Sequence, residues 1–439
     1  MLAERYGTVS LIDIARQVGP AGVPSLSDKA FGLSFFSSAI LFVFPVALML
    51  GPWSAGLVAL LAGVWAWAAA SCRSADGPAP AAFGAWLLAL LVFGGHWLLD
   101  AGRGGGVPMA AHTLASLPYW PLLAAGLFLA WRRFPPAPAA LWWGAALAAA
   151  VAGGLLLHQW GGTARVRVRT DMNSIPFGNL SLCFGVLALV GGLFPRRDPR
   201  RGALLVVAGV LGLVASLLSG TRGGWITVPA VVLMLVAWRG GALWRRWSSL
   251  PLAWRVVGGA VLLALAVFAA ARVWPRVEDL LSDLHRFAAD GNTRTSVGLR
   301  LDMWGTAWSL FLQKPWLGWG EQGLALELHR LIVAGRLNEQ AQYFGYQLHG
   351  DVLDTLARRG LLGLGTLLPL YLVPAWLCWR RLRQAGAVAM AGLLTVVMFA
   401  GFGLTQSQFR DPHTLAGYLV LMSGLLVMSV RVGGGGRPG

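Results

Sequence analysis

Long apolar runs separated by short polar connections dominate the pattern of this chain. An apolar run of roughly 20 residues can cross a bilayer as an α-helix, whereas strands of a membrane β-barrel are only about 10 residues long and alternate in polarity. The pattern therefore predicts an all-α polytopic membrane protein. About twelve such runs occur, near 30–50, 53–70, 82–99, 116–131, 139–158, 176–194, 202–219, 223–238, 256–274, 361–379, 386–404 and 413–430.

One long connection interrupts this pattern and divides the chain into three parts. We expect a bundle of nine spans over 1–274, a helical loop over 275–360 and three further spans over 361–439. Within the loop, 302–312 and 324–335 have apolar residues at spacings of three and four, which is typical of amphipathic helices. Pro315, Gly318 and Gly320 separate the two. The prediction is a small cap of helices on the membrane surface.

Charge and composition change the picture in one respect. Of the 439 residues, 56% are hydrophobic and 12% are charged, against about 25% charged in soluble domains. A net charge of +17 could indicate a nucleic-acid partner, but the basic residues gather in every second short connection and near both ends of the chain. This is the distribution of the positive-inside rule, which places both termini in the cytoplasm. Nucleic acid is therefore not an expected partner, and the long loop is expected on the outer face.

Several arginines lie on the expected outer face, where that rule does not explain them. Arg165, Arg167 and Arg169 alternate within TARVRVRTDMNS, residues 163–174. An extended segment would place all three side chains on one face. The strip could bind an anionic substrate, or it could contact anionic lipid headgroups.

Arg222 and Arg300 are two further candidates for anion binding. Arg222 lies in the turn SGTRGG, which opens the run at 223–238, with Ser219 or Thr221 as the possible N-cap. A helix N-terminus favours anions, and the guanidinium fork can bind two phosphate oxygens. The alternative is an interfacial arginine that reaches toward lipid headgroups. Arg300 lies one turn before Trp304, where it could stack on the ring or lie on a solvated helix face.

His349 is the candidate general base, in the stretch YQLHGDVLDTLARRGLLGLG, residues 346–365. Imidazole is the side chain whose ordinary pKa lies near neutrality. The alternative is a polar residue that caps the last helix of the loop. Asp351 and Asp354 could orient the imidazole, or they could pair with Arg358 and Arg359.

Three segments in this order resemble the O-antigen ligase and polymerase superfamily of bacterial inner membranes. They are TRGGW (221–225), RLDMWGTAWSLFLQKPWLGWG (300–320) and HGDVLDTLARRGLLGLG (349–365). Members carry an (S/T)RG turn, an R…W…P–LG–G segment and an H-N-x-x-L-E/D-x-x-x-x-x-G-(L/I)-x-G segment around a large periplasmic loop. Gly350 stands where the family usually has Asn, and Asp354 stands where Glu is usual, so a role for that Asn side chain does not carry over. The similarity covers approximately residues 173–365.

The resemblance implies a GT-C-like glycosyltransferase of the O-antigen ligase type. The donor would be O-antigen on undecaprenyl diphosphate, and the acceptor a sugar hydroxyl of the lipid A-core oligosaccharide. Arginines would bind the diphosphate, and the histidine would take the acceptor's proton in a displacement that inverts the anomeric carbon. The implied catalytic residues are His349, Arg222 and Arg300. The side chains expected to help bind diphosphate or glycan are Arg165, Arg167, Arg169, Asp351, Asp354 and Trp304.

The resemblance also sets expectations for cofactors and location. Metal-using membrane glycosyltransferases have acidic residues in the first outer loop, and the corresponding connection at 50–56 has no carboxylate. We therefore expect neither a metal nor another cofactor. The implied location is the bacterial inner (cytoplasmic) membrane, in contact with membrane lipids, with the active site on the periplasmic side.

Other functions fit parts of the sequence. An O-antigen polymerase would use the same donor and arginines but a different acceptor, and a protein O-oligosaccharyltransferase also belongs to the superfamily. A transporter or flippase is the alternative from another class. Transporters are often built from internal repeats, and none is visible in this sequence.

Overall fold

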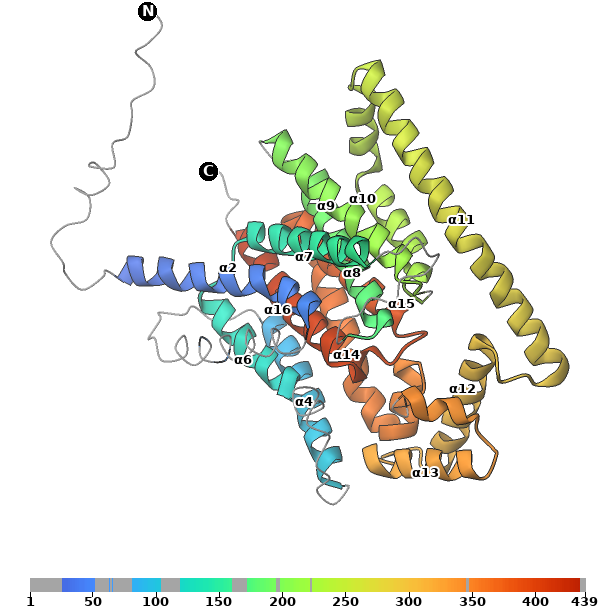
Figure 1. Ribbon diagram of the computed structural model, residues 1–439. Coiled ribbons are helices and arrows are strands. Elements are labelled where there is room, and N and C mark those ends of the chain that lie inside the picture. The colour runs from blue at the N-terminus through green and yellow to red at the C-terminus, as the bar shows by residue number, and fades with distance from the viewer. Residues whose placement is uncertain are drawn as a thin grey trace, which may run out of the picture.

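The fold is known from a computed structural model, which describes residues 26–51, 63, 65, 81–103, 119–159, 172–194, 198–221, 223–344 and 347–434. Within this part of the chain all regular elements are helices, which confirms the predicted all-α class (Figure 1). All but one of the predicted spans fall on helices, and the exception, 53–70, lies almost entirely outside the described residues. The apolar helices are α2 (Leu26–Leu50), α4 (Ala81–Arg103), α6 (Tyr119–Arg133), α7 (Pro138–His158), α8 (Ser174–Leu193), α9 (Pro199–Leu218), α10 (Val228–Ser248), α11 (Leu252–Asp290), α14 (Asp351–Ala385), α15 (Ala387–Phe402) and α16 (Pro412–Gly434).

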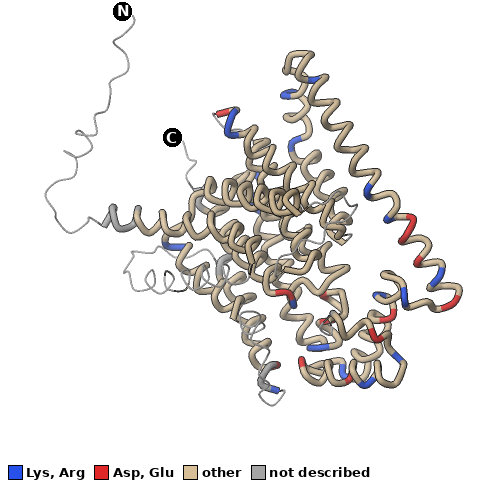
Figure 2. The backbone as a smooth tube through the Cα atoms, in the orientation of Figure 1, with Lys and Arg blue, Asp and Glu red and all other residues tan. Residues whose placement is uncertain are grey.

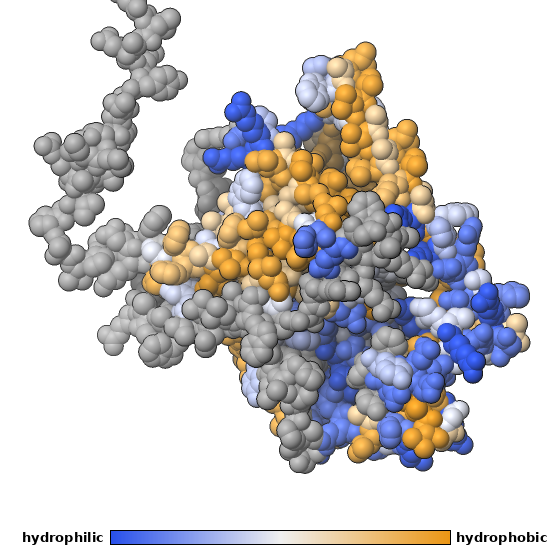
Figure 3. All heavy atoms as spheres, in the orientation of Figure 1, coloured by the Kyte–Doolittle hydropathy of each residue, from blue (hydrophilic) through white to orange (hydrophobic). Residues whose placement is uncertain are grey.

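Eight stretches in the described chain are long and apolar enough to cross a membrane, and α4 and α15 contain shorter apolar stretches. The chain is therefore a multi-pass membrane protein. Helices α8 and α16 form the centre of the bundle, since 83% and 94% of their apolar windows are buried. Both are apolar on all sides, as expected for helices surrounded by other helices. Figure 3 shows apolar side chains over the outside of the bundle, where lipid would lie.

Helix α11 stands apart from the bundle and is longer than its apolar run predicts (Figure 1). Its 39 residues make a helix of roughly 60 Å, about twice the thickness of the hydrocarbon core. The predicted start of the loop at 275 therefore falls inside this helix. Apolar residues give way to charged ones there, but the residues that follow still form a helix, so the end of the apolar run is not the end of the helix.

Two helices occupy the long connection, as predicted. They are α12 (Ser296–Gln313) and α13 (Glu321–Val333), followed by a short 3₁₀ helix, η2 (Glu339–Phe344). Their apolar faces form a separate small core that includes Leu299, Met303, Leu310, Leu324 and Leu328. Figure 2 shows charged residues gathered over this region and the adjoining end of α11, with few across the middle of the bundle.

Backbone contact at two glycines joins the connection to helix α14. The segment after α12 crosses a break in α14 at Gly360, which has φ 63° and ψ −159°. Trp319 N donates to Ala357 O at 3.0 Å, and Leu361 N donates to Pro315 O at 2.7 Å. A Cβ atom at Gly318 or Gly360 would come within 2.4 Å of the opposing backbone. Only glycine allows this approach, and the crossing fixes the connection against the start of α14. Because α14 begins at residue 351, the predicted loop end at 360 also lies inside a helix.

Candidate active site

His349 has an unusual backbone conformation. Its φ of 50° makes it the one non-glycine residue of the described chain with a positive φ. Such a conformation costs about 1–3 kcal/mol and persists only where neighbours hold it. Trp304 Nε1 donates to His349 O at 3.1 Å, and the next peptide groups bond to the segment after α15, with Asp351 N donating to Gly403 O at 2.8 Å. The backbone of His349 is thus held by two other parts of the chain, α12 and the segment after α15.

The side chain of His349 is buried, and Gln406 contacts its ring. Nδ1 lies 2.6 Å from Gln406 Oε1, and Gln406 Nε2 donates to Gln347 Oε1 at 3.0 Å. Burial and the positive charge of Arg300 lower the pKa of His349 to about 4, against smaller opposing effects of Gln406 and Asp354. The imidazole is therefore neutral at pH 7, which is the state that can accept a proton.

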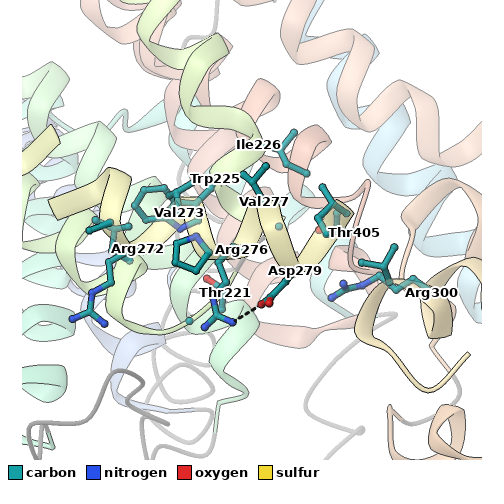
Figure 4. A pocket seen from close by; sticks show the side chains of 17 residues that line it. Thr221, Trp225, Ile226, Arg272, Val273, Arg276, Val277, Asp279, Arg300 and Thr405 are labelled. Atoms are coloured by element: carbon teal, nitrogen blue, oxygen red, sulfur yellow. Dashed lines mark hydrogen bonds and ion pairs between the residues drawn. The ribbon is translucent and has the colours of Figure 1, made fainter. Parts of the chain in front are cut away.

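A pocket of about 620 Å³ lies between the end of α9, α11 and α12 (Figure 4), and His349 is not among the described residues that line it. Its polar lining includes Arg272, Arg276 and Arg300, with Asp279 as the one carboxylate among the residues that the structure describes. Figure 4 shows Arg276 and Asp279 joined by an ion pair, whose atoms lie 3.4 Å apart. The rest of the lining is largely apolar and includes Leu217, Trp225, Ile226, Val277 and Leu280. Net positive charge beside apolar side chains suits a lipid-linked anion.

Two residues connect the pocket with His349. Thr405 lines the pocket, and the next residue, Gln406, contacts the imidazole. Arg300 also lines the pocket and is close enough to lower the pKa of His349. An anion in the pocket would therefore lie near the imidazole.

Of the arginines predicted to bind an anion, Arg300 is in the pocket. Four others lie outside the described residues: Arg222, Arg165, Arg167 and Arg169. The residues on either side of position 222, Thr221 and Gly223, both line the pocket.

The predicted N-cap at the start of the next span is wrong. Ser219 closes α9, and its Oγ lies 3.0 Å from Thr221 Oγ1. A 3₁₀ helix, η1 (Gly223–Thr227), follows, and α10 begins only at Val228 without a side-chain cap. The paired hydroxyls stabilise the turn itself, so the sequence signal of an N-cap was misread.

Asp351 and Asp354, predicted to help bind substrate, are buried and bonded within the protein. Asp351 accepts from Tyr371 Oη at 2.8 Å and from Phe409 N at 3.1 Å. Asp354 accepts from Leu348 N at 3.0 Å and is 1% exposed. Neither contacts His349 by a hydrogen bond in the described chain. Both support the loop that carries His349, and their predicted contact with substrate stays a prediction.

Trp304 also has a structural task. It was predicted to help bind substrate, but its one N–H group donates to the carbonyl of His349. A tryptophan has no other hydrogen-bond donor in its side chain. This bond holds the positive-φ conformation of His349, and a contact of the indole ring with substrate stays a prediction.

A second charged cluster lies on the other side of Asp354. Three arginines surround Glu321, with Arg358 Nη1 at 3.0 Å and Arg410 Nη2 at 2.9 Å from Oε2 and Arg359 Nη2 at Oε1. Burial raises the pKa of Glu321, but these arginines outweigh it and lower the pKa to about 2. The carboxylate is therefore charged at any physiological pH.

Two further acids balance this cluster. Asp354 Oδ1 lies 2.9 Å from Arg358 Nη2, and Asp100 Oδ2 lies 3.1 Å from Arg359 Nε. The pairing of Asp354 with Arg358 was one of the two predicted alternatives, and it is confirmed. The cluster ties α4, α13 and the 3₁₀ helix η3 (Gln408–Arg410) to α14, so it acts as a structural clamp.

Sequence reasoning missed several residues of this site. Arg272 and Arg276 line the pocket from the extended part of α11, and Gln406 contacts His349 from 57 positions further along the chain. Arginines near the end of an apolar run look like ordinary interfacial residues. A single glutamine belongs to no recognisable sequence pattern, so its contact with His349 is visible only in the folded chain.

Comparison with known proteins finds similarity over the region that contains His349 and most of the pocket. A family model described as O-antigen ligase matches residues 204–368, which include α11, α12 and His349. The chain is 24% identical over 292 residues to an uncharacterized protein of Haemophilus influenzae, covering 65% of this chain and 72% of that protein. It is 22% identical over 227 residues to an O-antigen ligase of Escherichia coli K12, covering 51% of each chain. With its three sequence motifs and its all-helical membrane fold, the chain is similar to the O-antigen ligase superfamily across this region.

Proposed function

We propose that the chain is an O-antigen ligase. It transfers glycan from undecaprenyl diphosphate to a sugar hydroxyl of lipid A-core at the periplasmic face of the bacterial inner membrane, and both of its termini lie in the cytoplasm. The observation that carries the proposal is a neutral, buried imidazole beside a pocket with three arginines and one carboxylate. This combination provides a base for the acceptor and positive charge for the leaving group.

The arginine-lined pocket holds the donor's diphosphate in this proposal. Arg272, Arg276 and Arg300 provide guanidinium groups, which bind phosphate oxygens in pairs. Arg222 is assigned to the same task because its two neighbours in the chain line the pocket. The apolar lining accepts the first isoprene units of the lipid. Charge that develops on the departing diphosphate is stabilised where it forms, and this lowers the barrier.

The transfer proceeds as a single displacement. His349 takes the proton of the acceptor hydroxyl, whose oxygen attacks the anomeric carbon from the face opposite the diphosphate. The bond from carbon to the diphosphate oxygen breaks, and undecaprenyl diphosphate leaves with the electron pair. The configuration at the anomeric carbon is inverted. The imidazolium then releases its proton to water.

The test uses purified protein, undecaprenyl-diphosphate O-antigen and lipid A-core, with a chelator present. His349→Ala should lower the rate of lipopolysaccharide formation by about 10²–10⁴-fold, the usual contribution of a general base, while donor binding is kept. His329→Ala is the matched control, because His329 is an exposed histidine of α13. Its rate should equal that of the parent.

Two outcomes would contradict the proposal. If the donor's glycan lengthens and none reaches lipid A-core, the chain is a polymerase. If His349→Ala is nearly as active as the parent, the base is another group, whichever acceptor is used.

A further inference from the structure

The segment between α15 and α16, residues 403–411, contacts the His349 stretch along its whole length. Ser407 Oγ accepts from Gly350 N at 3.4 Å, and Phe409 N donates to Asp351. Gln406 is the member of this segment that contacts the imidazole. The segment lies outside the region matched by the family model, 204–368, and none of the sequence motifs includes it.

The bonds of Gln406 assign the proton on the imidazole. Its carboxamide has an acceptor end, Oε1, and a donor end, Nε2. The donor end bonds to Gln347 Oε1 at 3.0 Å, so the acceptor end faces His349 Nδ1 at 2.6 Å. An acceptor in this position requires a hydrogen on Nδ1. A neutral imidazole carries one ring hydrogen, and Nε2 therefore holds the basic lone pair.

We propose that Gln406 is a positioning residue that keeps the proton on Nδ1 of His349 and thereby makes Nε2 the atom that receives the acceptor's proton. Gln347 fixes the direction of the Gln406 amide. The inference rests on the proposed function, since it assigns a task to Gln406 only if His349 is the base.

A glutamine at this position, in place of a carboxylate, affects how readily the imidazole gains and releases a proton. During transfer the acceptor's O–H bond breaks and an Nε2–H bond forms, while the Nδ1–H group stays bonded to Gln406. A neutral amide stabilises the resulting imidazolium less than a carboxylate would. Of the charged groups that act on His349, Arg300 on α12 disfavours the imidazolium and Asp354 on α14 favours it. The site thus holds an imidazole that is unprotonated before the reaction and releases its proton readily afterwards.

The experiment compares Gln406→Leu and Gln406→Glu with the parent chain in detergent. Leucine removes the acceptor, so both ring tautomers should be populated and turnover should fall about tenfold, less than the 10²–10⁴-fold expected for loss of the base. Glutamate keeps an acceptor and adds charge. It should preserve the tautomer, recover turnover relative to leucine at neutral pH, and move the acidic limb of the pH–rate profile upward by a unit or more, about the effect of a nearby opposite charge.

Gln408→Leu is the matched control. Gln408 is buried in the same segment, and its carboxamide atoms make no hydrogen bond within the described chain. Turnover and the pH profile should equal those of the parent. A fall in Gln406→Leu that is also seen in Gln408→Leu would mean that any apolar side chain in this segment disturbs the fold, and it would overturn the specific role of Gln406.

A second readout does not depend on activity. Nitrogen-15 NMR of histidine-labelled protein reports which ring nitrogen carries the hydrogen, and His349→Ala identifies the signal. The proposal requires an Nδ1–H signal in the parent and a mixed signal in Gln406→Leu. An Nε2–H signal in the parent would overturn it, because the amides would then be oriented the other way. If the tautomer changes as expected but turnover is the same in Gln406→Leu and His349→Ala as in the parent, the proposed base fails and the inference falls with it.

Discussion

Two groups of arginines lie near the His349 stretch, and they differ in burial and in the acids beside them. Arg358 and Arg359 are 1% and 2% exposed, and with Arg410 they face three carboxylates in the clamp around Glu321. The pocket arginines on α11 and α12 are half-buried, and Asp279, which pairs with Arg276, is the one carboxylate among the described residues that line the pocket. In the sequence Arg272 and Arg276 resemble Arg358 and Arg359, as arginines near the ends of apolar runs.

This difference in burial and in neighbouring carboxylates indicates which arginines are structural. Burying a charge is costly unless a partner compensates it, and the clamp contains its own compensation. The described lining of the pocket contains three arginines and one carboxylate, a set that an anionic ligand would complement. Changes in the clamp should therefore reduce stability, and loss of a pocket arginine should reduce donor binding at unchanged stability.

The largest effect is expected in the clamp. Glu321→Gln removes the carboxylate that three arginines share and should lower the free energy of unfolding by about 3 kcal/mol, as for other broken buried pairs. Thermal unfolding in detergent measures this. Glu327→Gln is the matched control on the same helix, where the carboxylate pairs with the exposed Arg330, and it should change the melting temperature little. Equal melting temperatures for the two variants would show that the clamp is not structural.

A smaller effect is expected from the ion pair in the pocket. Arg276→Ala should weaken donor binding about tenfold, since a charged hydrogen bond contributes about 1.5–3 kcal/mol. Asp279→Asn should have the opposite sign, because it removes the negative charge beside Arg276. Both should melt at the parent's temperature. Binding of undecaprenyl diphosphate in detergent measures the two effects, with the exposed Arg294→Ala as control. Weaker binding by Asp279→Asn would contradict an anion site.

The pH dependence of turnover sharpens the pocket side of the comparison. A base acts only when unprotonated, so the rate should be constant from neutral pH downward and fall about tenfold per unit below the pKa, which burial and Arg300 lower to about 4. Arg300→Ala removes the cation that disfavours the imidazolium, and the fall should then begin at higher pH. The measurement needs saturating donor, so that weaker binding does not obscure the shift. An unchanged pH profile in Arg300→Ala would show that the charge of Arg300 in the pocket does not affect the pKa of His349.

The sequence predicted the spans and the two loop helices because both depend on local periodicity. It did not predict where α11 and α14 begin or end, because helix formation continues past an apolar run when the next residues also favour a helix. The motifs correctly brought together His349 and Arg300, which act on each other in the fold. They could not decide whether Asp354 orients His349 or pairs with Arg358, because that depends on where Arg358 and Leu348 lie in the fold.

The site residues that the sequence did not predict are brought into place by contacts between segments that lie far apart in the chain. Gln406 reaches His349 across 57 positions, and Gly318 meets α14 only because the chain turns back after α12. A close backbone crossing requires glycine, and Gly318 and Gly320 were correctly predicted to separate the two loop helices. Their second partner, Gly360, belongs to the quoted motif of residues 349–365, but nothing in the motif indicates that another segment of backbone crosses it.

The smallest effect is expected at Gly350, between the histidine and the clamp. The family usually has asparagine there, and Gly350 has an extended backbone (φ −172°) that any residue adopts. A Cβ atom would lie 3.4 Å from Trp304 Nε1, which the indole can accommodate by a small shift. Gly350→Asn should therefore change stability by less than about 0.5 kcal/mol and leave turnover close to that of the parent. Gly360→Ala is the contrasting variant, since its φ and the opposing Trp316 backbone leave no room for a Cβ atom, and it should prevent normal folding. If Gly350→Asn keeps its melting temperature but loses turnover, the bond from Trp304 to the His349 carbonyl is the sensitive element, and alignment of the base depends on α12 more than on the clamp.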